Sequence, residues 1–347
     1  MRVRVTVAFA LFIAGWLWID ARAQTNAPIV SGAHRFEKVT DGVYYATASG
    51  TMTVGANSPI IVTDTEAIVV DSEITPAAAR ALIADIKAIT DKPVKYVIDS
   101  HYHYDHAFGN QVFGPDVQII GHENTRKRLL GNTQEQYTYQ VSLNPARADT
   151  LRQRIAAEKD PAQKAPLERA LANQLAYLEQ VKEIKVTPPT VTIDKKMTLY
   201  RGGREIQLLY FGRGHTDTDV VIYLPKEKIV CTGDLMESVI SYMGDAYADE
   251  WSATLDRLMT LDFDTVLPGH GVVFKGKAHI QAFQRYVNAL LKQTMDLKKQ
   301  GVAADAAAPR IDMTSFAPDF PQLRAPGVDV AAVRRIYALA DHPEPAH

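Results

Sequence analysis

The sequence predicts an α/β protein with one helical insertion, and three observations support this interpretation. Short runs rich in β-branched residues alternate with amphipathic segments of helical period along most of the chain. Residues 133–188 differ, because they are rich in Gln, Ala, Leu, Glu and Lys and contain few β-branched residues. Hydrophobic residues make up 46% of the 347, which suffices for a sizeable core. A chain of this length can hold one large domain or two small ones.

The N-terminus has the pattern of a secretory signal peptide. Residues 1–4 are basic, residues 5–19 are apolar, and Ala21-Arg22-Ala23 has the small-x-small pattern of a cleavage site. We expect cleavage after Ala23, so that residues 1–23 are removed. A membrane anchor is the alternative, but spanning a bilayer takes about 20 apolar residues. We therefore expect a periplasmic or secreted protein with no stable membrane span after cleavage.

Charge and cysteine content exclude two classes of protein. The formal net charge of -2 gives no overall field that would attract nucleic acid or an anionic membrane. The single cysteine, Cys231, excludes a framework of intrachain disulfides. We interpret Cys231 as a small core residue and not as a metal ligand.

The first half of the chain predicts strands, a helix and further strands. Strands are expected at residues 42–47, 59–63 and 67–71. A helix should follow, because Thr75 suits the N-cap and Pro76 suits the first helical position. Its apolar residues recur at helical spacing: Ala79, Leu82, Ile83, Ile86 and Ile89. Strands at 94–99 and 117–120 and a helix at 123–130 complete this half.

The insertion, residues 133–188, is expected to be a helical hairpin. Its helices are expected at 145–159 and 165–184, because Asp160-Pro161 interrupts the helical pattern. The insertion could be a purely structural flap. A lid or substrate-facing role is the alternative, because long insertions often serve as lids.

The second half predicts more strands, followed by helices. Strands are expected at 190–193, 197–200, 205–211, 219–224, 228–232 and 265–267. Helices are expected at 251–261, 277–299 and 328–339. Residues 302–308 are interpreted as an alanine-rich linker, and residues 341–347 as a disordered tail.

Residues 101–106 read His-Tyr-His-Tyr-Asp-His, and few stretches this short could bind two metal ions. The cluster follows the expected strand 94–99, so its side chains lie where a strand gives way to a loop. Three more candidates each follow a strand-like run beside glycine: His215, Asp234 and His270. This is typical of site residues carried on loops at one edge of a sheet.

The types of these residues suit zinc. Imidazole nitrogens and carboxylate oxygens are good Zn²⁺ ligands, and three protein ligands plus water make an open catalytic site. The candidates exceed the needs of one ion: His101, His103, Asp105, His106, His215, Asp234 and His270. Five histidines and two aspartates can hold two zinc ions, which together can activate a water and polarise the bond under attack.

The His-x-His-x-Asp-His cluster, Gly-His-Thr, Thr-Gly-Asp and Pro-Gly-His, in this order, resemble the metallo-β-lactamase superfamily. The resemblance runs from about residue 37 to 275, interrupted by the insertion. It implies an αββα sandwich of two mixed sheets with metals at one edge. Residues 24–347 would then form one hydrolase domain, with residues 300–347 as a C-terminal extension.

The resemblance also implies a role for each candidate. His101, His103 and His215 match the ligands of a first zinc, Asp105, His106 and His270 those of a second, and Asp234 the bridging carboxylate. Asp71 resembles an acidic residue that supports the metal loop, since such partners orient ligating imidazoles.

The implied function is an exported, zinc-dependent hydrolase of small molecules that acts on an acyl bond of a β-lactam, lactone or ester. Hydroxide held by the two zincs and oriented by Asp105 would attack the carbonyl. The true β-lactamases carry Cys or Ser where this chain has Asp234, so the chain looks more like the thioesterase, lactonase, phosphodiesterase and esterase branches. An iron-dependent dioxygenase of the same fold and a non-catalytic binding or accessory protein are the alternatives. The oligomeric state stays open.

Other residues near these motifs have weaker support. His122 is expected to pack or cap a helix, and four histidines have no supporting context: His34, His279, His342 and His347. Four residues that follow Asp234 could line the cleft: Ser241, Tyr242, Tyr247 and Trp251.

Overall fold

The computed structural model describes residues 27–345 apart from residue 132, and for 133–144 it describes the backbone alone. The predicted signal peptide, residues 1–23, lies outside the described residues. No helix in the described part of the chain is long and apolar enough to span a membrane.

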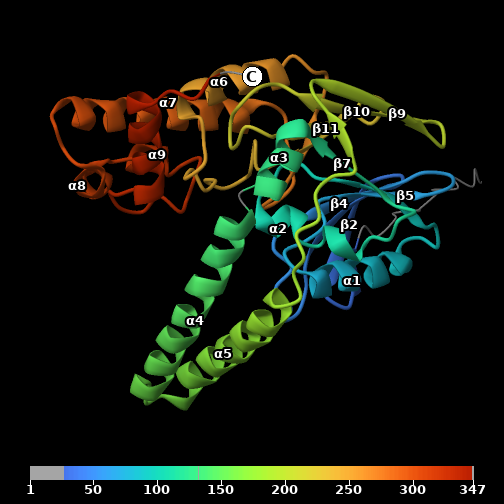
Figure 1. Cartoon of the computed structure of the whole chain (residues 1–347), viewed down its shortest axis with the longest axis horizontal. Helices are drawn as coiled ribbons and strands as arrows, with labels where there is room; N and C mark the ends of the chain where they lie inside the picture. The colour runs from blue at the N-terminus through green and yellow to red at the C-terminus, as the bar shows by residue number, and fades with distance from the viewer. Residues whose placement is uncertain (1–26, 132, 346–347) are drawn as a thin grey trace, which may run out of the picture.

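The strands form two mixed sheets (Figure 1). The first has eight strands in chain order: β1 (Ile29–Ser31), β2 (His34–Thr40), β3 (Val43–Ala48), β4 (Ser58–Val62), β5 (Ala67–Val70), β6 (Val94–Ile98), β7 (Gln118–His122) and β8 (Val191–Ile193). The second has six, in the order β14 (Phe274–Lys275), β13 (Thr265–Pro268), β12 (Ile229–Gly233), β11 (Val220–Leu224), β10 (Arg204–Tyr210) and β9 (Lys196–Arg201). Strands β5 to β8 run parallel, as do β12 and β13, and the other pairs are antiparallel.

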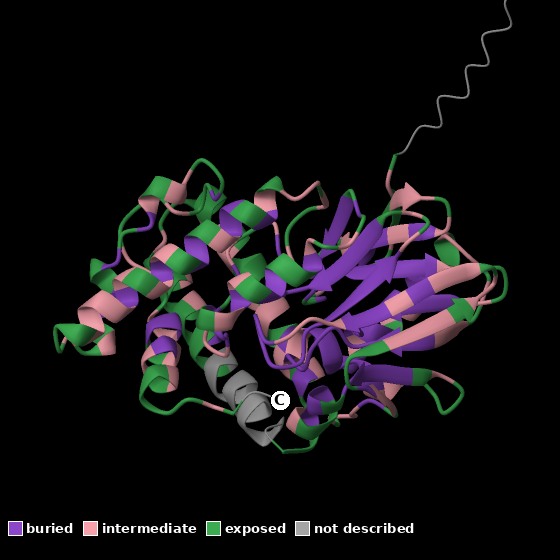
Figure 2. Ribbon diagram, turned by 90° about the horizontal axis from the view of Figure 1, so that it is seen from above, coloured by how far each residue is buried: buried purple, intermediate pink, exposed green. Residues whose placement is uncertain are grey.

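The strands alternate their side chains between two hydrophobic layers. In β11, Val220, Ile222 and Leu224 face the other sheet, where they pack with Ile68 and Ile98. Val221 and Tyr223 of the same strand face outward, against helices. This period of two is what places a sheet between two cores. Figure 2 shows that the strands are mostly buried, while the outward faces of the helices are exposed.

Helices cover the outer face of each sheet. The helix α1 (Pro76–Asp85) packs Ala79 and Leu82 on the first sheet. Helices α6 (Ala248–Leu258), α7 (Ala278–Lys299) and α9 (Val330–Asp341) share one core with the second sheet. The predicted αββα sandwich is therefore confirmed. The predicted cap is present too, because the Thr75 hydroxyl accepts a hydrogen bond from the Ala78 amide at 3.1 Å.

The insertion is a hairpin of two helices, α4 (Thr133–Ala157) and α5 (Pro161–Val181), which projects from the sandwich in Figure 1. The predicted start of its first helix at residue 145 is wrong, because Pro145 lies inside α4. A proline inside a helix removes one hydrogen bond without always ending the helix. At the base of the hairpin, Tyr177 and Val181 pack on Ile74 and Ala78.

Several other predictions differ from the structure. Strands β1 and β2 precede the first predicted strand, and α6 begins and ends three residues earlier than expected. The alanine-rich linker contains a short helix, α8 (Ala304–Ala307). The tail was expected to be disordered, but residues 341–345 are described and make side-chain contacts, as when Arg335 pairs with Glu344 at 2.8 Å. The pairing of Glu344 with the half-buried Arg335 is not visible in the pattern of the sequence.

Candidate metal centre

The seven predicted ligands come from four chain segments that end at one edge of the sandwich. His101 and His103 follow β6, and Asp105 and His106 lie in the short helix α2 (Tyr104–Ala107). The other three follow strands of the second sheet: His215 after β10, Asp234 after β12 and His270 after β13. Both sheets therefore contribute side chains to the same place.

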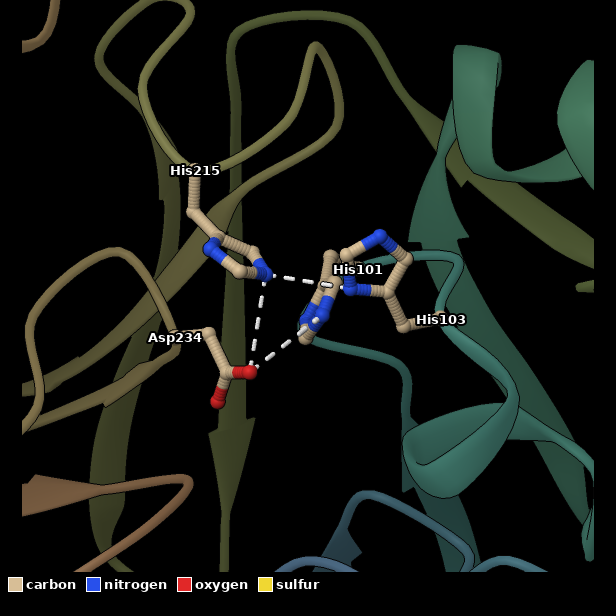
Figure 3. A group of neighbouring side chains, drawn as sticks. All are labelled: His101, His103, His215 and Asp234. Atoms are coloured by element: carbon tan, nitrogen blue, oxygen red, sulfur yellow. Dashed lines mark hydrogen bonds and ion pairs between the residues drawn. The ribbon is translucent and has the colours of Figure 1, made fainter. Parts of the chain in front are cut away.

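His101, His103, His215 and Asp234 form a first group, shown in Figure 3. One ligand atom from each lies within 4.8 Å of those of the other three. His215 Nε2 is 3.0 Å from His103 Nδ1 and 3.5 Å from Asp234 Oδ2. His101 Nε2 is 3.8 Å from the same carboxylate oxygen. All four residues are buried.

Asp105, His106 and His270 form a second group beside the first. The Asp105 carboxylate is 3.1 Å from His270 Nε2 and 3.8 Å from His106 Nε2. Asp234 joins the two groups, because its Oδ1 is 3.3 Å from His106 Nε2 and its Oδ2 is 3.5 Å from His270 Nε2. The structure thus brings all seven predicted residues together.

The glycines beside these residues allow close approach of the loops. A Cβ built on Gly269 would lie 2.2 Å from Asp234 Oδ1 and 2.8 Å from His106 Cε1. A Cβ on Gly233, which has a φ of +50°, would lie 2.3 Å from the Ser100 hydroxyl oxygen. Any larger residue at either position would displace a neighbour in the site.

A buried carboxylate holds the outer nitrogens of two imidazoles. Asp71 Oδ2 is 2.8 Å from His106 Nδ1, and it accepts a hydrogen bond from the Ser100 hydroxyl at 2.9 Å. The Ser100 oxygen is in turn 3.0 Å from His101 Nδ1. Asp71 has a φ of +63°, which is unusual for a residue other than glycine. This geometry agrees with the supporting role that the resemblance implies for Asp71.

His103 has an outer partner that the sequence did not reveal. Its Nε2 lies 3.0 Å from Asp245 Oδ2, which leaves Nδ1 to face His215. Asp245 follows Gly244 in an irregular loop, and only its acidic side chain could have drawn attention to it.

Burial and charge fix the protonation of the site. Burial lowers the pKa of His215 to about 3 and that of His101 well below its usual value. Both imidazoles are therefore neutral and able to bind a metal ion. Burial opposes ionisation of Asp105, but His106 and His270 outweigh it and lower the pKa of Asp105 to about 2.

Positive charge is favoured where the two groups meet. Burial opposes charge on His270, but Asp234 and Asp105 prevail and raise its pKa to about 10. The pKa of His106 is also raised despite burial, mainly by Asp234 and Asp71. Carboxylates that raise the pKa of neighbouring imidazoles would equally stabilise a metal cation.

The ligand atoms fit a metal on a second ground. Four buried atoms of the seven residues have no hydrogen-bond partner among the described residues: His101 Nε2, His106 Nε2, His215 Nδ1 and Asp234 Oδ1. Buried polar atoms are nearly always paired, so unpaired nitrogen and carboxylate atoms gathered in one place fit a site that binds a metal ion. Nitrogen and carboxylate donors of this kind suit Zn²⁺.

Most of the weaker predictions can be placed as well. Cys231 is fully buried among hydrophobic residues, as expected. His122 Nδ1 accepts a hydrogen bond from the Asn124 amide, which confirms a capping and packing role. The exposed ring of Tyr242 lies 6.2 Å from that of His103 and lines the site. Trp251 belongs to the core, where its indole donates to the Leu235 carbonyl.

Comparisons with known proteins agree with this geometry. A family model described as the metallo-beta-lactamase superfamily matches residues 52–270. A linear primary-alkylsulfatase from Pseudomonas sp. is 23% identical over 286 residues, which is 78% of this chain and 53% of that protein. A type 2 metallo-beta-lactamase from Bacillus sp. is 30% identical over 118 residues, which is 32% of this chain and 42% of that protein. The chain spans about half the length, or less, of the curated relatives it matches.

Solved structures share the fold. A metallo-beta-lactamase from Pontibacter korlensis superposes with a TM-score of 0.53 at 20% identity, covering 74% of this chain and 99% of that one. A double mutant of a sec-alkyl sulfatase gives 0.65 at 17% identity, covering 88% of this chain and 50% of that one. At these identities the likeness concerns the fold alone. Because the family model matches more than half of the sequence, the chain belongs to the metallo-beta-lactamase superfamily.

Proposed function

We propose that this chain is a hydrolase that holds two zinc ions and cleaves an acyl bond of a small molecule, such as a β-lactam, a lactone or an ester. One observation carries the proposal. The Asp234 carboxylate lies between two groups of imidazoles, with Oδ1 toward His106 and Oδ2 toward His215 and His270. A carboxylate in this position would bridge two metal ions.

We assign the ligands to the two zinc ions in the way that the resemblance implies. His101, His103 and His215 would hold one zinc, Asp105, His106 and His270 the other. Zinc, when bound, supplies an activated water and polarises the bond under attack. Asp105 is ionised, so its carboxylate can accept a hydrogen bond from the attacking water and orient it.

The activities named for the relatives support hydrolysis and suggest a second candidate bond. An alkylsulfatase cleaves sulfate esters, and the match to that protein covers 78% of this chain against 32% for the β-lactamase. This longer match favours a sulfate ester as the second candidate substrate. In either case water enters at the bond that breaks, which yields an acid and an alcohol or, from a lactam, an acid and an amine.

The predicted signal peptide supports an exported enzyme. Residues 1–23 have the basic start, apolar stretch and small-x-small site of a secretory signal. Recovery of the protein from the periplasm or medium with its N-terminus at Gln24 is the expected result. Intact residues 1–23 on a cytosolic protein would contradict export.

A hydrolysis screen tests the proposal. The mature protein with measured metal content would be assayed on a chromogenic cephalosporin, an acyl homoserine lactone, p-nitrophenyl acetate and p-nitrophenyl sulfate. We expect turnover of at least one compound, and loss of that turnover in His101→Ala and Asp234→Ala. Asp262→Ala is the matched control, because the exposed Asp262 carboxylate forms an ion pair only with Lys228 among the described residues.

Three outcomes would count against the proposal. Activity that survives both site substitutions would refute the site assignment. One iron per chain in place of two zincs would favour a dioxygenase of the same fold. A zinc-loaded protein that hydrolyses nothing across the panel would favour a binding or accessory protein.

A further inference from the structure

A carboxylate from the segment after α9 lies in a pocket of arginines close to the metal centre. Glu344 accepts hydrogen bonds from the Arg335 guanidinium at 2.8 Å and from the Tyr247 hydroxyl. Its other near neighbour is Arg128, whose guanidinium is 4.0 Å away. We call the four residues Arg128, Arg213, Tyr247 and Arg335 together the arginine pocket.

The arginine pocket is held in place without Glu344. Arg128 donates to the Asp217 carboxylate at 2.9 Å, and its guanidinium lies 5.7 Å from the centre of the Tyr102 ring. Arg213 is paired with Glu250. These carboxylates fix two of the arginines by charge-assisted hydrogen bonds.

The ring of Tyr247 fixes the rest of the pocket. The guanidinium carbons of Arg213 and Arg335 lie over this ring, at 4.2 and 4.6 Å from its centre. Arginine stacks well on aromatic rings and stays charged, so it is suited to such a position. Tyr247 itself is almost fully buried, which leaves its hydroxyl little freedom to point elsewhere.

The charge of Arg335 is balanced by Glu344. Arg335 Nε donates to the Ala246 carbonyl, and Glu344 is the one carboxylate within 4 Å of its guanidinium among residues 27–131 and 145–345. Asp217 pairs with Arg128, and Glu250 pairs with Arg213. Without Glu344, the pocket would present an unpaired guanidinium and a buried hydroxyl to any anion.

Short contacts connect the arginine pocket to the metal centre. The Tyr247 amide donates to the carbonyl of Gly214, the residue before His215. Arg335 supports Ala246, whose neighbour Asp245 is 3.0 Å from His103 Nε2. Arg128 lies over Tyr102, and the Tyr102 ring is 4.8 Å from that of His103. The pocket therefore borders the His103 side of the site.

We infer that the arginine pocket is a binding subsite for the carboxylate of an acidic substrate, and that Glu344 occupies it in place of that carboxylate. This inference rests on the proposed function. The bond to be cleaved would lie at the metal centre, while the acidic group of the same molecule would reach Arg335 and Tyr247. Glu344 belongs to a segment, residues 342–345, that has no helix or strand. The backbone carbonyls of Glu344 and Pro345 accept hydrogen bonds from the Arg213 guanidinium.

An intramolecular carboxylate would compete with a free one. If Glu344 filled the pocket about 90% of the time, it would weaken the apparent affinity for an external carboxylate roughly tenfold. Replacing Glu344 by glutamine removes the competing charge and keeps the size of the side chain. The substitution should therefore strengthen binding of an external acid, which a purely structural contact would not do.

Calorimetric titration with glutarate tests the inference on the zinc-loaded protein. Glutarate carries a carboxylate on a short flexible chain, as the glutamate side chain does. We expect Glu344→Gln to lower the Kd for glutarate about tenfold relative to the unsubstituted protein. Adding Arg335→Gln to that variant should raise the Kd again by at least about tenfold, because a charged hydrogen-bond donor is lost.

Arg334→Gln is the matched control. Arg334 is the neighbouring residue on α9, but it is exposed and pairs with Asp305. Its substitution should leave the glutarate titration unchanged. Thermal unfolding of each variant shows whether it is folded, and the comparison of Glu344→Gln with and without Arg335→Gln is made only between folded proteins.

A kinetic comparison gives an independent measurement. The ratio of KM for mono-p-nitrophenyl succinate to KM for neutral p-nitrophenyl acetate should fall in Glu344→Gln and rise in Arg335→Gln. Glutarate binding that is unaffected by Arg335→Gln, or that weakens in Glu344→Gln, would overturn the subsite. If neither ester is hydrolysed, these esters give no support to the proposed acyl hydrolysis, and the titration alone decides the pocket.

Discussion

Three of the imidazoles, those of His101, His103 and His106, have an outer nitrogen whose partner fixes where the inner nitrogen points. The Asp71 carboxylate contacts His106 directly and reaches His101 through the Ser100 hydroxyl. The Asp245 carboxylate contacts His103. A carboxylate on one ring nitrogen fixes the tautomer and raises the basicity of the other nitrogen. Two aspartates that are not ligands would therefore set the affinity of the site for metal.

Asp245→Ala tests this at a single residue. Loss of an outer partner commonly costs about 10 to 100-fold in metal affinity. We expect the first zinc to bind at least about tenfold more weakly, measured by competition with a chromophoric chelator. Asp262→Ala should bind zinc as the unsubstituted protein does. Equal zinc affinity in Asp245→Ala would show that Asp245 does not hold His103.

A second buried cluster supports the loop that carries Asp71. His34 Nδ1 is 2.9 Å from the Asp85 carboxylate, and its Nε2 is 3.3 Å from Glu73. Glu73 also accepts a hydrogen bond from the Ser58 hydroxyl. Burial opposes charge on His34, but Glu73 and Asp85 outweigh it and raise the pKa of the imidazole. The protonated form of His34 is therefore favoured between these two carboxyl groups, while burial raises the pKa of Glu73 itself.

His34→Asn should destabilise the fold in a pH-dependent way. Removing one partner of a buried ion pair costs about 3 kcal/mol or more of unfolding free energy. Because the folded pKa of His34 is raised, its contribution is complete below the unfolded value of about 6.5 and is lost as pH rises through the folded value. Urea unfolding between pH 5 and 9 should show the largest deficit at the acid end. A deficit that grew with pH would contradict the assignment.

At the scale of elements, the strand ends determine which loops can meet. The loop after β13 approaches the loop after β12 so closely that position 269 admits no side chain beyond hydrogen. Gly269→Ala should therefore displace the Asp234 carboxylate. A displacement near 1 Å in a catalytic site costs roughly 100-fold in rate.

We expect Gly269→Ala to lose about that much kcat/KM and to bind zinc more weakly, while its circular dichroism spectrum stays native. Gly114→Ala is the matched control, since nothing lies within 4 Å of the Cβ it would gain. Full activity in Gly269→Ala would mean that the loops around Asp234 need not approach so closely.

Patterns within short stretches of sequence predicted the strands and the candidate ligands. Runs rich in β-branched residues indicated most strands. The His-Tyr-His-Tyr-Asp-His run and three glycine-flanked motifs indicated all seven residues that the structure brings together. Contacts between distant segments could not be predicted in this way. Asp245 lies 142 positions from His103, and Glu344 lies 97 positions from Tyr247, whose hydroxyl donates a hydrogen bond to it. Pro145 misled the interpretation because packing can retain a helix that proline weakens.

At the scale of the whole molecule, the sandwich places the ends of both sheets at one edge. The first sheet supplies His101, His103, Asp105 and His106, and the second supplies His215, Asp234 and His270. Neither sheet holds a complete set for two ions. Metal binding and packing of the two sheets should therefore be coupled.

Metal content per chain, measured by mass spectrometry on purified protein after dialysis, tests the central claim most directly. We expect two zincs in the unsubstituted protein and in Asp262→Ala. We expect loss of at least one zinc in Asp234→Ala, because that carboxylate joins both groups. One metal per chain in the unsubstituted protein, or two zincs retained in Asp234→Ala, would contradict the claim.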